Sequence, residues 1–339
     1  MSNIHEYLVD RVDVHVLGRD VVKIDLVYLR GVLHVEAGVA ALLLQGTKTA
    51  IELLQDVIQA LDILQRALEL LVRLFLTGAE LDDTGGLLED LAALTALGGD
   101  HWAPQVQKAC SELGIDLSHA RTITGGTTST YLYLMDEQGE MALAVSDMEI
   151  CKKITPAYLS GHLGLLQNAQ VVICDCNIPE ESLVYLAENC TAPLFCDPVS
   201  TIKAEKLRPI LGSIHTLKPN RLEAELLTGI PIHDEADVEK AADKLLAMGL
   251  RRVFISLGGD GMYAATHDAS YWGENLPCRM VNTTGCGDSA MAALVWAYLE
   301  GLSLEESVRA ALAAGSITIE SPETISPEMS EELLRQRMT

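Results

Sequence analysis

The stretch "VNTTGCGDSA", Val281 to Ala290, places two glycines around Cys286, an aspartate after them, and the apolar run "MAALVWAYL" behind. Glycines at this spacing predict a backbone that turns tightly or approaches a ligand closely. The apolar run predicts a helix, and amides at a helix N-terminus bind anions. A carboxylate would repel an anion that simply rested there. We therefore expect Asp288 to take a proton from a hydroxyl group that then attacks the anion.

The composition excludes several classes of protein. The chain has 339 residues, enough for one large or two ordinary domains, and its content of 49% hydrophobic and 21% charged residues predicts a folded globular protein. With 24 basic and 48 acidic residues the net charge is -24, which disfavours nucleic-acid partners. Eight cysteines without CxxC pairs predict neither a disulfide framework nor a zinc site.

The sequence favours a cytoplasmic location. Glu6, Asp10 and Asp13 leave no apolar core for a signal peptide near the first residues. No run of about 18 apolar residues is present, so we expect no membrane-spanning helix and no membrane partner.

Strand and helix patterns alternate from about residue 105 onwards. The residues predict a hairpin over 128–146 that turns at 136–139, and strands at 170–176, 193–200, 251–258 and 261–267. Helices are expected at 106–115, 155–169, 179–190, 221–229, 234–250, 291–299 and 303–319. This order predicts an α/β fold with a mainly parallel sheet, helices on both faces, and a ligand beyond the carboxyl ends of the strands.

The first 85 residues follow another pattern. Residues 11–29 and 31–38 are expected to form strands, and residues 51–76 a leucine-rich helix that packs in a core or against a second chain, giving a homo-oligomer. The polar face of this helix has no excess of lysine and arginine, which disfavours a membrane surface. We expect an atypical segment over 1–85, either an altered lid or an association element, and a kinase-like domain over 86–339.

Two further stretches are typical of phosphate chemistry. In "LKPNRLEAELLTG" Asn220 and Glu223 lie one helical turn apart, which suits hydrated Mg²⁺ bound through its waters; the alternative is an exposed helix start with routine acids. "SLGGDGMY", Ser256 to Tyr263, would let a nucleotide phosphate approach the backbone, although alone it indicates only a hairpin turn.

Together these stretches resemble the ribokinase (PfkB-type) family of ATP-dependent sugar and nucleoside kinases, from about Asp100 to the end of the chain. "NTTGCGD" is similar to the C-terminal signature of that family and "NRLE" to its NxxE magnesium motif. "DEQGEMALAVSDMEI", "CDCNIPEESL" and "FCDPVS" resemble the members that phosphorylate pseudouridine. The resemblance implies transfer of the γ-phosphoryl group of ATP to the 5′-hydroxyl of pseudouridine. The alternatives are another sugar or nucleoside substrate, or a non-catalytic nucleotide-binding regulator that associates through residues 51–76.

The resemblance also implies roles for single residues. Asp288 would be the general base, for which an ordinary pKa suffices if it acts late, and the amides of Gly285, Cys286 and Gly287 would form the anion hole. Asn220 and Glu223 would organise Mg²⁺ and the triphosphate, with Glu223 acting through water. A monovalent cation such as K⁺ is often required in the family. The remaining residues expected at the site are Ser256, Gly258, Gly261 and Thr284 beside the nucleotide, and Thr127, Thr128 and Asp147 in the substrate pocket.

Two features depart from the family pattern. Cys286 stands where alanine is common, and a helix N-terminus can lower a thiol pKa and so favour oxidation. The sugar-binding "GGxGxN" turn is replaced by Gly85 and Gly86 followed by Leu88 and Asp90, and neither Asp20 nor Asp25 is singled out as the early substrate-binding aspartate. Three explanations remain: a rearranged substrate lid, a nucleotide-binding protein without turnover, or an N-terminal segment that is foreign to the fold through fusion or a disturbed reading frame.

Overall fold

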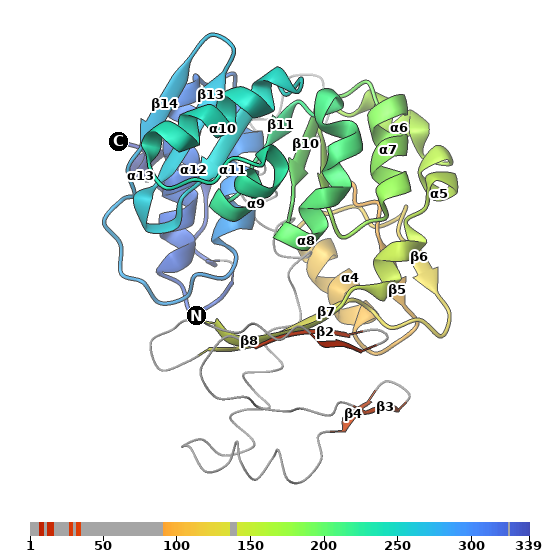
Figure 1. Cartoon of the computed structure of the whole chain (residues 1–339). Helices are drawn as coiled ribbons and strands as arrows, with labels where there is room; N and C mark the ends of the chain where they lie inside the picture. The colour runs from red at the N-terminus through yellow and green to blue at the C-terminus, as the bar shows by residue number, and fades with distance from the viewer. Residues whose placement is uncertain are drawn as a thin grey trace, which may run out of the picture. The chain divides into compact units, whose positions relative to one another are not determined.

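The computed structural model describes residues 91–135, 141–324 and 326–339, together with four short strands between residues 7 and 34 (Figure 1). The chain divides into two compact units, which are described separately. The first comprises Met1–Ile63, Leu97–Val106 and Thr122–Ile150, and the second comprises Leu64–Ala96, Gln107–Arg121 and Cys151–Thr339. Several predicted features lie outside the described residues: the helix over 51–76, the turn over 136–139, and Asp20, Asp25, Gly85, Gly86, Leu88 and Asp90.

The first unit contains a four-stranded antiparallel sheet in the order β1 (Tyr7–Val9), β2 (Val12–Val16), β8 (Met141–Asp147), β7 (Thr130–Met135). The predicted hairpin over 128–146 is confirmed by the pairing of β7 with β8. Strand β2 pairs with β8, so strands from both sides of the predicted boundary after residue 85 share one sheet. Two further strands within the predicted N-terminal segment, β3 (Val27–Leu29) and β4 (Val32–His34), pair with each other.

The second unit is built on a six-stranded sheet in the order β14-β13-β12-β11-β10-β9. Its parallel part comprises β9 (Val172–Asp175), β10 (Leu194–Asp197), β11 (Thr216–Leu217) and β12 (Arg252–Ser256). The other two strands, β13 (Met262–Thr266) and β14 (Ser270–Gly273), run antiparallel at one edge. The predicted mainly parallel sheet is therefore confirmed, while β11 and β14 were not predicted. A separate short pair joins β5 (Ala96–Gly98) and β6 (Arg121–Ile123).

Most helices begin at the polar residues that the sequence offers as caps. The side chains of Thr155, Ser200, Asp234 and Ser303 accept hydrogen bonds from the first turns, and Gly229 ends α9 in a left-handed conformation. The helices of the described chain are α4 (Ala103–Glu112), α5 (Pro156–Ser160), α6 (Leu163–Asn168), α7 (Glu180–Asn189), α8 (Thr201–Ala204), α9 (Arg221–Thr228), α10 (Glu235–Ala247), α11 (Cys286–Leu299), α12 (Leu304–Ile319) and α13 (Glu331–Arg337). Short 3₁₀ segments cover Glu149–Lys153, Glu205–Ser213 and Gly258–Asp260.

One helix that was predicted as continuous is divided in two in the structure. The sequence indicated a single helix over 155–169, whereas the structure has two short helices, α5 and α6, separated by Gly161 and His162. His162 has φ -118° and ψ 15°, which is outside helical geometry, so the hydrogen-bonded ladder is interrupted there.

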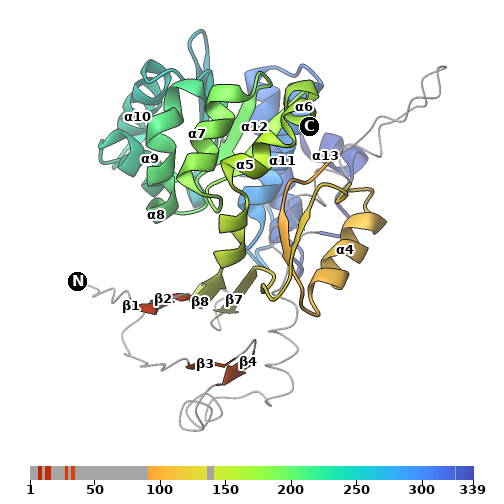
Figure 2. The same cartoon turned by 90° about the vertical axis from the view of Figure 1, so that its right-hand side faces the viewer.

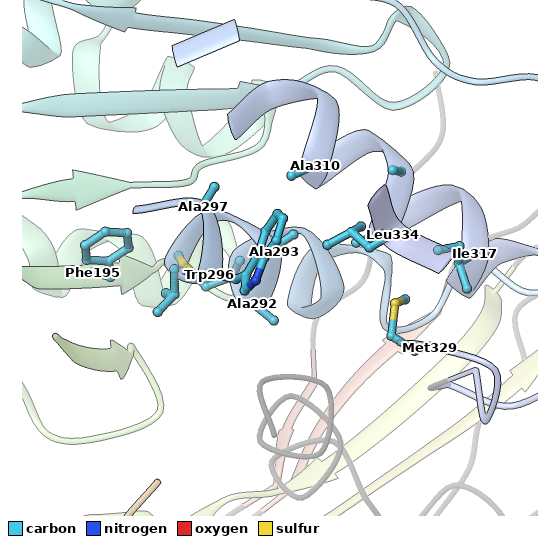
Figure 3. Packing of buried hydrophobic residues seen from close by; sticks show 13 residues of the cluster. Phe195, Ala292, Ala293, Trp296, Ala297, Ala310, Ile317, Met329 and Leu334 are labelled. Carbon is cyan, nitrogen blue, oxygen red and sulfur yellow. The ribbon is translucent and has the colours of Figure 1, made fainter. Parts of the chain in front are cut away.

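Helices cover both faces of the second unit's sheet, with α9 and α10 on one side and α11 and α12 on the other (Figure 2). Side chains of a strand alternate between faces, so Phe254 of β12 packs against Leu294 of α11 and Val308 of α12. Figure 3 shows the adjoining core, where Trp296 and Leu334 lie among the small side chains of α11 and α12. The alanines of α11 and α12 let the two helices pack close together. This packing places the N-terminus of α11 at the sheet. Among the described residues, no helix is long and apolar enough to cross a bilayer.

Candidate active site

Polar side chains gather where the parallel strands end, an edge we call the carboxyl edge. β9 ends at Asp175 and β10 at Asp197, and the two residues are direct neighbours in the sheet register. Lys218 follows β11, and Ser256 at the end of β12 pairs with Asn220. Ligands of open α/β sheets bind at this edge, so the observed strand order supports the predicted position of the site.

The turn before α11 has the geometry of an anion site. Gly285 adopts a left-handed conformation with φ 88°, and a side chain there would collide with the carbonyl oxygen of Thr324, so only glycine fits. The amides of Gly285 and Gly287 have no hydrogen-bond partner among the described residues, whereas the Cys286 amide donates to the Thr283 carbonyl at 3.4 Å. The turn therefore presents free N–H groups at a helix N-terminus, where negative charge is stabilised.

Asp288 lies in the first turn of α11 and is partly buried. Burial raises the pKa of its carboxyl group to about 7; Asp197 and Asp175 add to the rise and the ammonium group of Lys218 opposes it. An ordinary pKa would suffice for a base that acts late, but the pKa of Asp288 is raised instead. A carboxylate with a pKa near neutrality accepts a proton more readily than a surface aspartate and is still ionised in part at pH 7, as a general base requires.

Lys218 was not predicted as a site residue from the sequence. Its Nζ lies 2.9 Å from Oδ2 of Asp197, and both side chains are largely removed from solvent. Burial acts to lower the pKa of Lys218, but the net shift is upward because of Asp197, with further contributions from Asp288 and Glu223. A polar residue directly after a short buried strand was the available signal, since strand ends form the ligand-binding edge.

Asn220 and Glu223 form a capping box at the start of α9. The Glu223 amide donates to Oδ1 of Asn220 at 2.9 Å, and the Asn220 amide donates to Oε2 of Glu223 at 2.8 Å. Glu223 is only 3% exposed, and burial raises its pKa. The helix start is exposed at Asn220 and Leu222, but the acid at Glu223 is not an ordinary surface carboxylate. Capping fixes the carboxylate at the carboxyl edge, which fits the expected hold on the waters of Mg²⁺.

The glycine-rich turn after β12 leaves open space beside the backbone. Gly258 has φ 61°, and nothing lies within 4 Å of the position that a Cβ would occupy. Gly261 has φ 88°, and a Cβ there would collide with the carbonyl oxygen of Gly273. Ser256 contacts the Pro219 carbonyl at 3.5 Å. The turn leads from β12 into β13, and its open backbone at Gly258 fits the expected approach of a nucleotide phosphate.

The three residues expected in the substrate pocket belong to the first unit. Thr128 is buried; its hydroxyl donates to Oδ1 of Asp100 at 2.8 Å and accepts from the Gly98 amide at 3.0 Å. Asp147, at the end of β8, accepts from the Glu149 amide at 3.1 Å. These bonds give Thr128 and Asp147 local structural roles, and a substrate role for them and for Thr127 stays a prediction.

A buried hydroxyl beside the turn lacks a partner. Oγ1 of Thr284 is the one buried side-chain oxygen or nitrogen in the described chain without a hydrogen bond. Its amide donates to Oδ1 of Asn282 at 3.0 Å, and Nδ2 of Asn282 approaches the Pro322 carbonyl at 3.4 Å. Since Gly285 packs against Thr324, carbonyl oxygens of the 322–324 segment lie close by. Oxygen donors of this kind suit a hard cation.

The Cys286 thiol does not have the lowered pKa that a helix N-terminus can produce. Burial raises the pKa of Cys286 to about 12, with smaller contributions from Cys278 and Asp288. The sulfur contacts the Gly315 carbonyl at 3.7 Å. Cys286 therefore fills space at the turn as a neutral thiol, and only its backbone remains a candidate for catalysis.

Comparison with known proteins agrees with this geometry. Residues 85–331 match the model of the family described as pfkB family carbohydrate kinase. Pseudouridine kinase from Escherichia coli is 39% identical over 239 residues, covering 70% of this chain and 76% of the relative. An uncharacterized sugar kinase from the same organism, YeiI, is 33% identical over 71% of this chain and 67% of its own length. The crystal structure of a putative sugar kinase from Clostridium perfringens superposes with a TM-score of 0.70 at 29% identity, covering 82% and 84% of the two chains.

Proposed function

Because the chain belongs to the pfkB carbohydrate kinase family, we propose that it transfers the γ-phosphoryl group of ATP to the 5′-hydroxyl of pseudouridine. Members of this family are phosphotransferases that act on hydroxyl groups, and they use ATP with Mg²⁺. The observation that carries the proposal is the position of Asp288, a carboxylate with raised pKa that directly follows the free amides of Gly285 and Gly287.

The proposed reaction needs one base and one anion site. The acceptor oxygen bonds to the γ-phosphorus while the bond to the β–γ bridging oxygen breaks, and the hydroxyl proton passes to Asp288. Negative charge that builds up on the transferred group is stabilised by the amides of Gly285, Cys286 and Gly287, of which Cys286 must give up its long contact with Thr283. Asp288 then releases its proton to solvent.

The nucleotide and its metal would lie along the rest of the carboxyl edge. Bound Mg²⁺ neutralises phosphate charge, and the capped side chains of Asn220 and Glu223 would hold it through its waters. Ser256, Gly258, Gly261 and Thr284 would border the nucleotide: the two glycines have positive φ angles, which favour glycine, and Ser256 lies at the end of β12.

A different acceptor is the alternative for the substrate. The relative that is 33% identical is itself an uncharacterized sugar kinase, and family membership alone does not select pseudouridine over ribose or another nucleoside. The residues that would contact the base are not assigned by the motifs at the carboxyl edge. The acceptor must therefore be decided by assay.

The test measures ATP consumption by the purified protein with Mg²⁺ and pseudouridine, uridine, ribose or fructose. We expect turnover on pseudouridine well above the other three acceptors, and its loss in Asp288→Asn. Preferred turnover on another acceptor would replace the proposed substrate. Nucleotide binding without phosphorylation of any acceptor would favour the non-catalytic alternative.

We also propose a monovalent cation beside the turn, because the buried hydroxyl of Thr284 lacks a partner next to the 322–324 carbonyls. K⁺ would be bound by oxygen atoms there and would stiffen the turn that carries the anion-hole amides. We expect activity to rise when tetramethylammonium is replaced by K⁺, and Thr284→Val to remove most of that rise. Equal activity in both salts would contradict this proposal.

The location and assembly also remain proposals. All eight cysteines are free thiols, which is typical of the reducing cytoplasm where ATP is available. Association into a homo-oligomer would involve residues 51–76, outside the described residues. Sedimentation of the full chain, compared with a variant carrying Leu→Lys changes on that segment, would test it.

A further inference from the structure

Lys218 occupies a position that fold stability alone does not explain. Its side chain is 6% exposed and that of Asp197 is 18% exposed, with Nζ and Oδ2 2.9 Å apart. Removing two charges from water costs free energy that their mutual attraction repays only in part. A buried ion pair at the ligand-binding edge of a sheet therefore points to a functional reason for the charge.

The ammonium group also contacts the anion-site turn. A Cβ on Gly287 would lie 3.5 Å from Nζ of Lys218, so the lysine reaches the first turn of α11 as well as the end of β10. A positive charge at a helix N-terminus is unfavourable, because the helix dipole is positive there. Lys218 is tolerated at this point because carboxylates surround it, and its charge acts on the same turn that carries Asp288.

Charged groups from three strands act on Asp288: Asp175 from β9, Asp197 from β10 and Lys218 from the end of β11. Glu223 of α9 acts on Lys218, and Cys286 lies beside Asp288 in α11 itself. Lys203 of α8 lies beside Asp175, but its Nζ donates to Oδ1 of Asn177 at 2.7 Å. Among these groups, Lys218 is the cation whose charge favours the ionised form of Asp288.

We propose that Lys218 is a positioning residue for the reaction proposed above: its ammonium group, anchored by Asp197, keeps the Asp288 carboxylate ionised and directed at the acceptor hydroxyl. Without this cation, Asp288 would face Asp197 and Asp175 as a third carboxylate. The shared repulsion would then be relieved by protonation, and a protonated Asp288 cannot accept the hydroxyl proton.

The pH dependence of kcat/KM separates this role from a structural one. Lys218→Met keeps the length of the side chain and removes its charge, so the acidic limb of the profile should move up by about one pH unit or more. Asp197→Asn removes the repelling carboxylate and frees the lysine, so the limb should move down. The acidic limb of the double variant, which combines Lys218→Met and Asp197→Asn, should lie close to that of the unmodified protein. Lys218→Arg should largely retain the profile.

The control removes an exposed lysine. Lys240→Met breaks the surface ion pair with Asp237 on α10 and should leave the profile unchanged. An unmoved acidic limb in Lys218→Met, with loss of rate alone, would overturn the inference and leave the lysine a structural role. If Lys218→Met does not fold, the downward shift in Asp197→Asn and the retained profile in Lys218→Arg decide the question.

A second readout does not require turnover. Titration of the ¹³C-labelled side-chain carboxyl of Asp288, identified by its loss in Asp288→Asn, should show the same order of shifts in the same variants. If no acceptor is phosphorylated by the unmodified protein, the proposed function fails, while this titration still decides the inference. Identical titration of Asp288 in the unmodified protein, Lys218→Met and Asp197→Asn would contradict it.

Discussion

Replacing Asp288 by asparagine should stabilise the folded protein at neutral and alkaline pH while removing its activity. Burial, with repulsion from Asp197 and Asp175, raises the pKa of Asp288 from 3.8 to about 7. One pKa unit corresponds to about 1.4 kcal/mol, so the ionised carboxylate lowers the free energy of unfolding by up to about 4 kcal/mol above pH 7. Asparagine keeps the size of the side chain and removes this cost.

The sign of the pH dependence follows from where the proton is bound. Between about pH 4 and pH 7 the folded protein holds a proton on Asp288 that the unfolded chain has released, so this group's contribution to stability falls as the pH rises. The stability gained by Asp288→Asn should therefore be small near pH 4, grow through pH 7 and then level off.

Urea unfolding at pH 5 to 9 measures this gain directly. The control is Asp268→Asn, a change of an exposed aspartate on the turn between β13 and β14, which should have little effect on the free energy of unfolding at any pH. A gain from Asp288→Asn that does not change with pH, or a loss of stability at pH 8, would refute the electrostatic reasoning.

Three further substitutions test other parts of the site. Gly285→Ala should reduce kcat/KM by at least about 100-fold, because Gly285 has φ 88° and an added Cβ collides with the Thr324 carbonyl. The control Gly164→Ala in α6 places its Cβ in open space and should leave activity unchanged. Glu223→Gln should raise the Mg²⁺ concentration needed for half-maximal activity by about 10-fold, with melting temperature almost unchanged, because the amide oxygen still accepts from Asn220. Val199→Asn should stabilise the protein by roughly 1 kcal/mol in urea unfolding, because a β-branched residue with φ 67° is strained and this side chain is 43% exposed; an unchanged midpoint would argue against strain there.

The order of strands and helices after residue 105 could be predicted because each element has its own hydrophobic pattern and end signals. Asp234 and Gly229 mark helix boundaries in the sequence, and both act as expected. The break at Gly161 and His162 was missed because a leucine-rich pattern continues across it. Strand β11 was missed because it has only two residues, and β14 because it is short and partly exposed, with little alternation to detect.

The candidate site was predictable where its chemistry is local in sequence. Gly285 and Asp288 lie within one turn, and Asn220 and Glu223 form one capping box, so a short motif contains each pair. The Lys218–Asp197 pair joins segments about 20 residues apart that meet only because β10 and β11 are neighbours. The raised pKa of Asp288 was missed for the same reason, since it depends on burial and on charges from β9 and β10.

The most direct test of the account follows the γ-phosphoryl group itself. The protein is incubated with Mg²⁺, pseudouridine and ATP labelled with ³²P at the γ-position, and the labelled products are separated by chromatography. The phosphorylated position is identified by ³¹P NMR of the same product made with unlabelled ATP. The account predicts label on the 5′-oxygen of pseudouridine, with almost none transferred by Asp288→Asn. Label that stays in ATP, or appears only as inorganic phosphate, would contradict it.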